Sequence, residues 1–483
     1  MIRIGVLFYI ISIIEIVVSI MMLPPLFLAY YQNDPVWQGF ASSFSICFFL
    51  SISIYLSCRG TKVKDISLKE TFLLTTLSWV SLALIASLPF YLADIGMSYV
   101  DCFFEAMSGV TTTGATIFTD LDNSPKSILL WRAILNWIGG VGVIMLAIAI
   151  LPMLKIGGMQ LFRSESSDKS DKIFPRVQQI SKAIGIIYLC LTISCFSLYL
   201  LFDMTFFDAV VHALTTVSTG GFSSHDASIG FFDDYRIEIT VILFMFLGSL
   251  PFPILIKCMN RDFKSFYQDS QIQTLFFLLI LVIVILSLWL IQTHKYDFLT
   301  ALRYSSFNVV AILTTTGFTS YDYYSWGGFA VILFFFIGVI GGCTGSTTGG
   351  IKIFRFQILF STAREQLARL VHPHVVYNIT FSKNAVSSSG TSAVMGFFIL
   401  FSFCFSVIAC LLSFQGLDFI TAFSAATSVM ANLGPGLGDI IGPSGNYSPL
   451  SDSVKWILTI GMIVGRLEIF TVFILFTKLF WKD

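Results

Sequence analysis

The chain has little charge. Only 12% of its 483 residues are Asp, Glu, Lys or Arg, and the formal net charge is zero. A soluble domain carries roughly twice that charged fraction, so the composition argues against a soluble protein. The balanced charge also predicts no general attraction to nucleic acid.

Residue patterns of metal sites and covalent catalysis are missing as well. The nine cysteines lie mostly inside apolar runs, with neither metal spacing nor a paired extracellular framework. His372 and His374 stand close together, but no further candidate ligand accompanies them. No nucleophile and base pair is recognisable, so we expect neither an enzyme nor an organic cofactor in this chain.

Hydrophobic runs are abundant instead. Hydrophobic residues make up 56% of the chain, and 50 residues are phenylalanine. Ten runs are long enough to cross a bilayer as helices, which predicts an all-α polytopic membrane protein. They lie near residues 4–30, 36–57, 68–93, 129–152, 180–203, 236–258, 272–293, 327–360, 391–415 and 454–478.

The basic residues predict an orientation. If the N-terminus is cytoplasmic and ten spans alternate, most of the 28 lysines and arginines fall in cytoplasmic segments. One such segment is the polar linker RSESSDKSDK at 163–172. We therefore expect both termini in the cytoplasm of a cell whose inner membrane holds the chain.

Four shorter apolar segments lie between the spans, near residues 101–113, 208–219, 298–316 and 418–433. They are too short to cross the hydrocarbon core, so we expect re-entrant half-helices. A polar turn with glycine follows each one: TTTGAT at 111–116, VSTGGF at 217–222, TTTGFT at 314–319 and NLGPG at 432–436. The order of span, short helix, turn and span therefore repeats four times.

Each short helix is expected to begin at or just after an aspartate, which can cap it and complement its positive end. These aspartates are Asp101, Asp208, Asp297 and Asp418. We align the four turns on the glycines Gly114, Gly220, Gly317 and Gly434.

Non-helical backbone at membrane depth must be buried in protein or line a water-filled path. Four such turns around one axis can offer a ring of oxygens to a monovalent cation. For one turn alone, helix packing through small residues is an equal alternative, but four recurrences favour a filter. The candidate ion-binding residues are Thr112, Thr113, Gly114, Ser218, Thr219, Gly220, Thr315, Thr316, Gly317, Asn432, Leu433 and Gly434. The fourth turn lacks threonines, so we assign it backbone carbonyls only.

The pattern SGVTTTGAT, TTVSTGGFS, TTTGFTS and ANLGPGLG resembles the TrkH/TrkG/KtrB superfamily of potassium transporters, over essentially the whole chain. Two extra N-terminal spans resemble the TrkH branch rather than the shorter KtrB. The resemblance implies a pseudo-fourfold pore in one chain, potassium uptake, a homodimer and a cytoplasmic ring of TrkA-like nucleotide-binding subunits. Potassium would then be the only metal bound, through the filter. A sodium-coupled or sodium-permeable member of the superfamily is the alternative.

The repeats divide the chain into five parts. An N-terminal two-helix region at 1–66 precedes pore repeats at 67–170, 171–265, 266–385 and 386–483. The third repeat contains an interruption, IGGCTGSTTGGIK at 340–352, inside the eighth apolar run.

This interruption has three interpretations. A phosphate loop, which would suit a membrane-embedded nucleotide-binding enzyme or scaffold, lacks the GK[ST] ending and a preceding strand. Close helix packing through glycine is a second interpretation. We favour an unwound stretch below the filter, and the resemblance implies that it is a gate. The residues concerned are Gly341, Gly342, Gly345, Ser346, Thr347, Thr348, Gly349 and Gly350.

Arg466 lies near the middle of the last apolar run, roughly 18 Å from either end of the expected helix. It should therefore face the protein interior or water. Glu468 would point to another face of that helix and is a poor partner. We expect Arg466 to bond carbonyls of the broken stretch and to hinder cations, and the resemblance implies a pore-closing arginine here. A purely structural arginine is the alternative. For Glu15 and Glu105 the sequence offers no choice of role.

Overall fold

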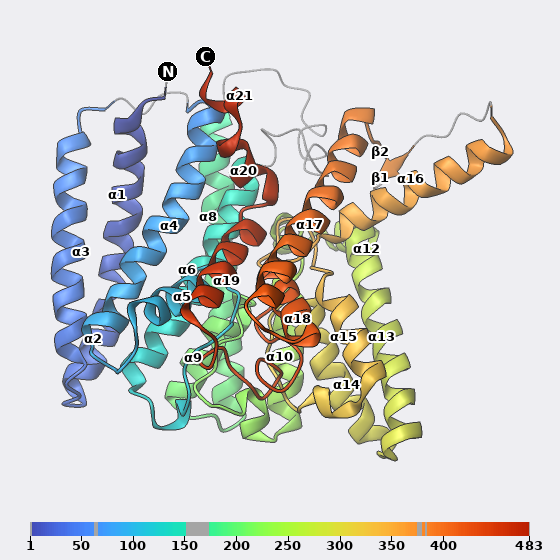
Figure 1. The fold of residues 1–483 in the computed structure, drawn as a ribbon, viewed down its shortest axis with the longest axis horizontal. Coiled ribbons are helices and arrows are strands. Elements are labelled where there is room, and N and C mark those ends of the chain that lie inside the picture. The colour runs from blue at the N-terminus through green and yellow to red at the C-terminus, as the bar shows by residue number, and fades with distance from the viewer. Residues whose placement is uncertain (1, 62–65, 151–172, 374–378, 382–383, 483) are drawn as a thin grey trace.

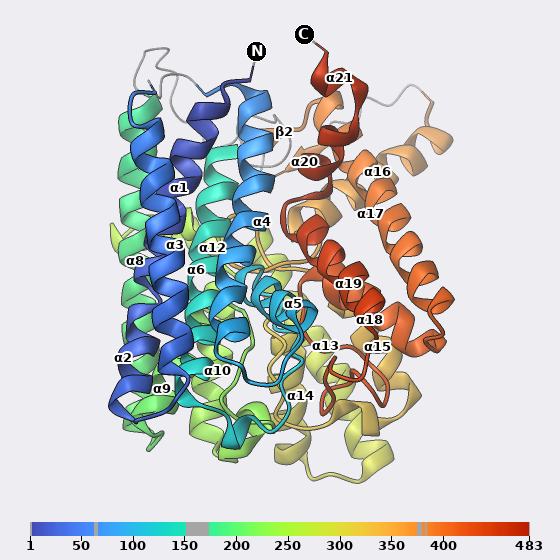
Figure 2. The same cartoon turned by 60° about the vertical axis from the view of Figure 1, so that its left-hand side comes forward.

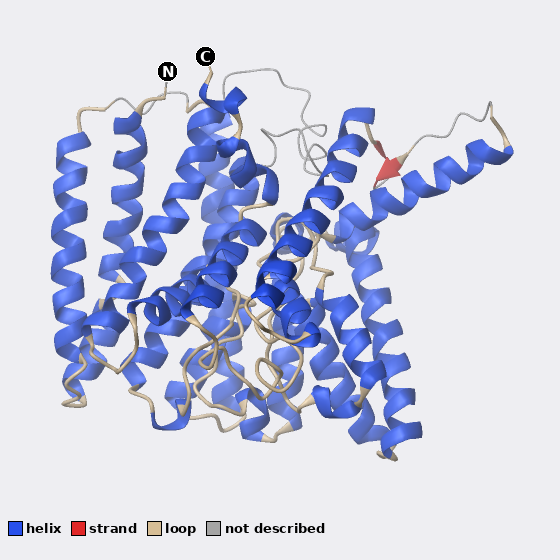
Figure 3. Cartoon of the chain, in the orientation of Figure 1, coloured by secondary structure: helices blue, strands red, loops and turns tan. Residues whose placement is uncertain are grey.

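The structure is a computed structural model that describes residues 2–61, 66–150, 173–373, 379–381 and 384–482. Helices dominate it, and loops gather near its centre (Figure 3). The described residues contain one short antiparallel pair of strands, β1 (Thr380–Phe381) and β2 (Asn384–Ala385). The predicted all-α polytopic class is confirmed, and both ends of the chain lie at the same side of the bundle (Figure 1).

The N-terminal region packs as a group of long helices beside the rest of the bundle (Figure 2). They are α1 (Ile4–Ile20), α2 (Leu23–Tyr31) and α3 (Trp37–Cys58), followed by α4 (Leu68–Leu92) of the first repeat. A capping box starts α4, because Ser67 and Glu70 exchange hydrogen bonds. Glu70 also accepts a 2.9 Å bond from the Arg3 side chain, which joins the starts of α1 and α4.

The predicted repeat of span, short helix and span is present four times. The short helices are α5 (Tyr99–Val110), α9 (Phe206–Val217), α14 (Phe298–Leu313) and α18 (Phe419–Ala431). The helices before them are α4, α8 (Ile173–Leu201), α13 (Ser270–His294) and α17 (Ser388–Phe414). Those after them are α6 (Lys126–Ile150), α10 (Tyr235–Gly248), α15 (Gly328–Gly338) and α19 (Asp452–Arg466).

Smaller elements complete the described chain. The α-helices among them are α11 (Phe252–Met259), α12 (Phe263–Gln268), α16 (Ile353–Val371), α20 (Ile469–Phe473) and α21 (Lys478–Trp481). The 3₁₀ turns are η1 (Leu121–Asn123), η3 (Ser228–Phe232), η4 (Tyr323–Trp326) and η5 (Ile474–Phe476).

The prediction of aspartate caps is correct for two short helices. Asp297 and Asp418 precede α14 and α18 directly and accept bonds from N–H groups of the first turn, at 3.2 and 3.1 Å. Each carboxylate thereby satisfies a backbone donor that has no partner within the helix.

For α5 and α9 the predicted cap was wrong. The caps are Ser98 and Thr205, whose hydroxyls accept the N–H groups of Asp101 and Asp208 at 3.2 and 3.1 Å. The Asp101 side chain in turn accepts the backbone N–H of Ser98, which completes a capping box. Asp101 is therefore the third residue of the helix and not its cap. Both carboxylates remain in the first turn, where they still complement the positive helix end.

Three of the ten predicted spans are sharply bent or interrupted, whereas α1 and α2 together form the first span. Among the described residues, seven helices are long and apolar enough to cross a membrane, or nine if two bent pairs are each counted as one span. The sixth run bends by 101° between α10 and α11, where Pro251 cannot continue a helix. The tenth run bends by 110° between α19 and α20. The eighth is interrupted between α15 and α16, as expected from its glycines.

Candidate functional site

The four glycine turns share one unusual backbone conformation. One residue in each has a positive φ between 50° and 52°, and these residues are Thr112, Thr219, Thr315 and Asn432. A β-branched residue at positive φ is a genuine outlier. Its occurrence at three threonines indicates that the turns require this backbone conformation.

A shared hydrogen bond follows directly. The next residue of each turn donates its N–H to a carbonyl five residues earlier, at 2.9 Å in all four cases. The pairs are Thr113 to Ser108, Gly220 to Thr215, Thr316 to Ala311 and Leu433 to Ser428. The four short helices therefore end in the same way, and these residues occupy equivalent positions.

The next position is a glycine in every turn, again with positive φ. The φ values are 81° for Gly114, 76° for Gly221, 78° for Gly317 and 104° for Gly434. The equivalent glycine of the second turn is thus Gly221, and the predicted alignment on Gly220 was wrong by one residue. The second set is Thr219, Gly220 and Gly221, while Ser218 directly follows α9.

A local signal could have selected Gly221. Asp101 precedes Gly114 by 13 residues (114 − 101), and Asp208 precedes Gly221 by the same distance (221 − 208). Because both aspartates lie in the first helical turn, equal spacing places both glycines at the same distance beyond the helix.

The four turns close into a ring. Each glycine lies against a carbonyl oxygen of the next turn, so near that a Cβ would overlap it. A Cβ added to Gly114 would lie 2.4 Å from the carbonyl oxygen of Gly220, and one added to Gly221 would lie 1.8 Å from that of Thr316. A Cβ added to Gly317 would lie 2.1 Å from the carbonyl oxygen of Leu433, and one added to Gly434 would lie 2.8 Å from that of Thr113. The order runs from the first turn to the second, third and fourth and returns to the first.

The side chains of the turns mostly bond to protein. The hydroxyl of Thr113 lies 2.7 Å from that of Thr111, and the hydroxyl of Thr316 lies 2.8 Å from that of Thr314. Asn432 donates its amide to the Thr113 hydroxyl at 2.9 Å. The backbone carbonyls are therefore the chief candidates for ligands of a cation.

The four ring glycines line one cavity together with Arg132 and His225. Arg132 is buried and forms a 2.7 Å ion pair with buried Glu105 of α5. Glu105 also accepts the N–H of Ile117 at 2.9 Å, and Arg132 donates to the Ser223 carbonyl at 3.0 Å. Glu105 therefore braces the segments beside the first two turns. Arg132 was missed, although an arginine inside an apolar run was a visible signal.

His225 lies between two carboxylates at this cavity. Its Nδ1 pairs with Asp122, and its Nε2 lies 3.3 Å from Asp208. Burial alone would lower the pKa of His225, but pairing with Asp208 and Asp122 outweighs it and raises the pKa above the usual value. Sequence reasoning did not select this histidine.

The interrupted eighth run forms a buried loop. It leaves helical geometry after Gly338 and resumes it at Ile353. Two 3.0 Å bonds hold its ends together, from Gly341 to Ile351 and from Ile351 to Val339. The predicted unwinding is confirmed, and the element before the loop is the helix α15 rather than a strand.

This loop bonds directly to the second and third turns. Gly349 donates its N–H to the Thr315 hydroxyl at 2.7 Å, and the Thr219 hydroxyl donates to that of Thr347 at 2.9 Å. Thr347 also donates to the carbonyl of Gly248, at the break after α10, at 3.0 Å. The loop therefore lies immediately beside the ring.

Arg466 reaches the same loop. It is 5% exposed, and its Nη2 donates to the carbonyl of Thr347 at 3.0 Å. The expected bond between the arginine and the loop is therefore present. Arg466 ends α19, so the expectation that it lies inside a continuous helix was wrong.

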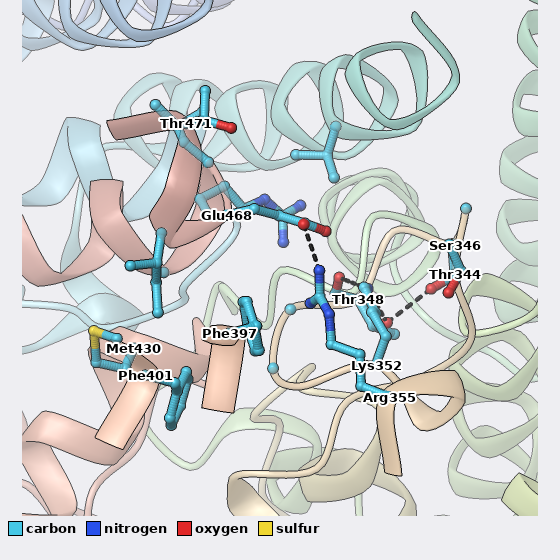
Figure 4. A pocket seen from close by; sticks show the side chains of 18 residues that line it. Thr344, Ser346, Thr348, Lys352, Arg355, Phe397, Phe401, Met430, Glu468 and Thr471 are labelled. Atoms are coloured by element: carbon cyan, nitrogen blue, oxygen red, sulfur yellow. Dashed lines mark hydrogen bonds and ion pairs between the residues drawn. The ribbon is translucent and has the colours of Figure 1, made fainter. Parts of the chain in front are cut away.

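Glu468 does not pair with Arg466 but forms a 2.5 Å ion pair with buried Arg355 of α16 (Figure 4). Lys352, also shown there, donates to the carbonyl and hydroxyl oxygens of Thr348. Both basic residues were missed, although they follow the glycine stretch within a few positions.

Two earlier observations extend beyond the described ranges. His374 and the linker 163–172 lie outside them. Within the part of the chain that the structure covers, no group of three His, Cys, Asp or Glu side chains could hold a metal ion.

Known proteins are similar to this chain in sequence and in fold. The family model TrkH, described as a cation transport protein, matches residues 36–483. The Trk system potassium uptake protein TrkI of Halomonas elongata is 41% identical, over 98% of this chain and 96% of its own length. The Trk system potassium uptake protein TrkH of Escherichia coli strain K12 is 35% identical, over 98% of both chains. The crystal structure of the potassium transporter TrkH from Vibrio parahaemolyticus matches with a TM-score of 0.92 and 36% identity, over 99% of this chain and all of that one. The chain therefore belongs to the TrkH family of cation transport proteins.

Proposed function

We propose that this chain takes up potassium across the membrane through the ring of four turns. The supporting observation is the closed order in which each ring glycine meets a carbonyl of the next turn. Carbonyl oxygens in a ring can replace the hydration shell of a monovalent cation. The matching relatives named as Trk potassium uptake proteins favour potassium as that cation.

Flux into vesicles that contain only the purified chain tests this function. Rubidium or potassium should enter without added nucleotide, and sodium should enter more slowly. Equal or faster sodium flux would identify a sodium-permeable transporter. If flux requires nucleotide hydrolysis, the proposal is wrong and the protein is a nucleotide-dependent one.

The gate of this pathway is the loop 341–350 together with Arg466. Three contacts support that role: Gly349 with Thr315, Thr347 with Thr219, and Arg466 with the Thr347 carbonyl. Because the loop bonds the ring and the arginine bonds the loop, a cation leaving the ring meets both. A fixed positive charge there raises the barrier to a cation.

Both termini face the cytoplasm, and the chain resides in the inner membrane of the cell. Their position at one side of the bundle supports this topology (Figure 1), as does the distribution of basic residues. In a chain whose nine native cysteines are replaced by serine, a cysteine introduced at Lys69 or at Lys482 should react with an impermeant maleimide only in inside-out vesicles. Labelling of either in intact cells would contradict the orientation.

Helix α16 is the proposed contact surface for a second copy of the chain. It projects from the bundle on the side of the termini (Figure 1). Several of its apolar side chains are exposed. Phe360, Leu367 and Leu370 are 69%, 64% and 80% exposed. Such a surface favours association. Leu367→Glu with Leu370→Glu should convert a homodimer to a monomer, as measured by light scattering, while Arg364→Ala should leave the mass unchanged.

A cytoplasmic TrkA-like ring of nucleotide-binding subunits is the proposed regulatory partner. Arg364 and Arg369 on the same helix supply positive charge at this side, with Arg369 also paired to Glu365 at 2.6 Å. Charge reversal at both arginines should weaken co-purification with a TrkA-like subunit. Undiminished pull-down would place the contact elsewhere on the cytoplasmic surface.

A further inference from the structure

The cavity beside the loop has an excess of positive charge. Its lining includes Lys352, Arg355 and Arg466, and Glu468 is the only carboxylate among its described lining residues. Because Arg355 already pairs with Glu468, Lys352 and Arg466 remain without an anionic partner among the residues that the structure describes. Unpaired charge in a site of low dielectric constant is costly unless a counter-charge or water approaches it.

Lys352 and Arg466 are held close to one another by the loop itself. Lys352 donates to the carbonyl of Thr348, and Arg466 donates to the carbonyl of the preceding residue, Thr347. Adjacent carbonyls thus draw two like charges to one short segment. Their mutual repulsion opposes the loop position that the structure shows.

Several donors in this cavity have no acceptor among the described residues. Arg466 is 5% exposed, and its Nε and Nη1 atoms are buried without a hydrogen-bond partner. The Nε of Arg355, a residue only 1% exposed, is in the same state. A buried guanidinium can donate five hydrogen bonds, so these unpartnered groups point to an acceptor that the described part of the chain does not supply.

We propose that this cavity binds one small inorganic anion of halide size, with chloride as the physiological candidate, when the loop is closed. The cavity volume of about 50 Å³ holds such an ion with a little water and excludes a nucleotide. The anion accepts bonds from Arg466 and weakens its repulsion with Lys352. It therefore stabilises the closed loop, a role that rests on the proposed gate. One negative charge against two cationic side chains still leaves one positive charge as the barrier to a cation.

Opening the loop separates Thr347 and Gly349 from the ring, and it disperses the cationic side chains that Thr347 and Thr348 hold. The anion site exists only in the closed arrangement, so anion binding shifts the equilibrium toward closure. Binding multiplies the ratio of closed to open protein by one plus the anion concentration divided by the dissociation constant of the anion. When the chloride concentration is ten times this dissociation constant, removal of chloride should raise basal potassium flux roughly tenfold.

Bromide provides a direct test that does not depend on transport. Crystals of the full chain grown in bromide should give an anomalous peak in the cavity beside Arg466, and Arg466→Met should lack it. Lys352→Met is the second variant, in case the first fails to fold, and should weaken the peak. Bromide bound only at the protein surface, or no ordered bromide, overturns the anion site even if potassium flux through the ring is normal.

Flux measurements then test its effect on closure. Basal rubidium flux is compared in vesicles loaded with chloride, phosphate or gluconate at equal ionic strength. Flux should be lowest in chloride, and Arg466→Met should abolish the difference between chloride and gluconate. Equal flux in all three solutions overturns the coupling to closure, and lowest flux in phosphate alone assigns the cavity to an oxyanion rather than a halide. Absence of any flux in all of them would instead count against the proposed transport function.

Discussion

Replacing Gly221 by alanine should damage the ring more than replacing Gly220. At φ 76° a Cβ on residue 221 would lie 1.8 Å from the carbonyl oxygen of Thr316. Real Cβ contacts are hardly ever under 3.0 Å, so that oxygen must move by about 1.2 Å (3.0 − 1.8). The strained backbone alone costs about 1–3 kcal/mol for a residue with a side chain.

That free energy corresponds to a loss of roughly 5- to 150-fold in occupancy of the intact ring. Potassium uptake by Gly221→Ala should fall within this range, or its preference for potassium over sodium should weaken, since one oxygen of the ring is displaced. The amount of the variant protein in the membrane must equal that of the wild type for this comparison. Gly317→Ala is the matched variant of the third turn, where a Cβ would lie 2.1 Å from the Leu433 oxygen.

Gly220→Ala meets a different obstacle, which can be removed. The nearest atoms to its Cβ belong to the Asn136 side chain, with Oδ1 at 2.1 Å and Cγ at 2.4 Å. The Asn136 amide has no hydrogen-bond partner in the described structure, so its loss is tolerable. Gly220→Ala combined with Asn136→Ala should therefore recover uptake and selectivity, while Gly221→Ala with Asn136→Ala should not. Recovery in the Gly221 pair, with persistent loss in the Gly220 pair, would refute the assignment of Gly221 to the ring.

Four further outcomes are expected. Arg466→Ala and deletion of residues 345–348 should each raise basal potassium flux without altered selectivity, and the double change should add little because both act on one closed state; lower vesicle flux in both would contradict the gate. Glu105→Gln leaves Arg132 as a buried unpaired charge, so the free energy of unfolding should fall by about 3–5 kcal/mol, with partial recovery when Arg132→Met is added, as measured by thermal unfolding in detergent. The pKa of His225 is raised by its carboxylate neighbours despite burial, so its charge contributes stability that is full below about pH 6.5 and is lost as pH rises through the folded pKa. That same charge beside the ring should reduce potassium uptake as external pH falls through the folded pKa, and a pH profile of His225→Gln with the same slope as the wild type would disprove this.

Local sequence features were sufficient for the architecture. Apolar runs of two lengths predicted spans and half-helices because a bilayer requires a minimum helix length. The four glycine turns, the interrupted eighth run and the buried position of Arg466 followed from the same constraint on backbone and charge in lipid. The caps at Asp297 and Asp418 were also local, since a cap depends on a few consecutive residues.

Features that depend on packing between distant segments were decided by the tertiary structure. The sequence VSTGGF offers two glycines, and the carbonyl of Thr316 from another repeat identifies Gly221 as the one without room for a side chain. Glu468 could not be paired from its helical position, because the helix breaks before it and Arg355, 113 residues earlier, reaches it. Glu105 had no assignable role until Arg132 of α6 was placed against it.

The physical reason is the range over which each interaction acts. Helix length, turns and burial in lipid are set by neighbours along the chain, so composition and spacing record them. A hydrogen bond or ion pair requires atoms within about 4 Å, and residues a hundred positions apart reach that separation only through the packing of whole helices. Sequence therefore determined that four glycine turns, a broken helix and a buried arginine exist, and the fold alone determined which atoms in them meet.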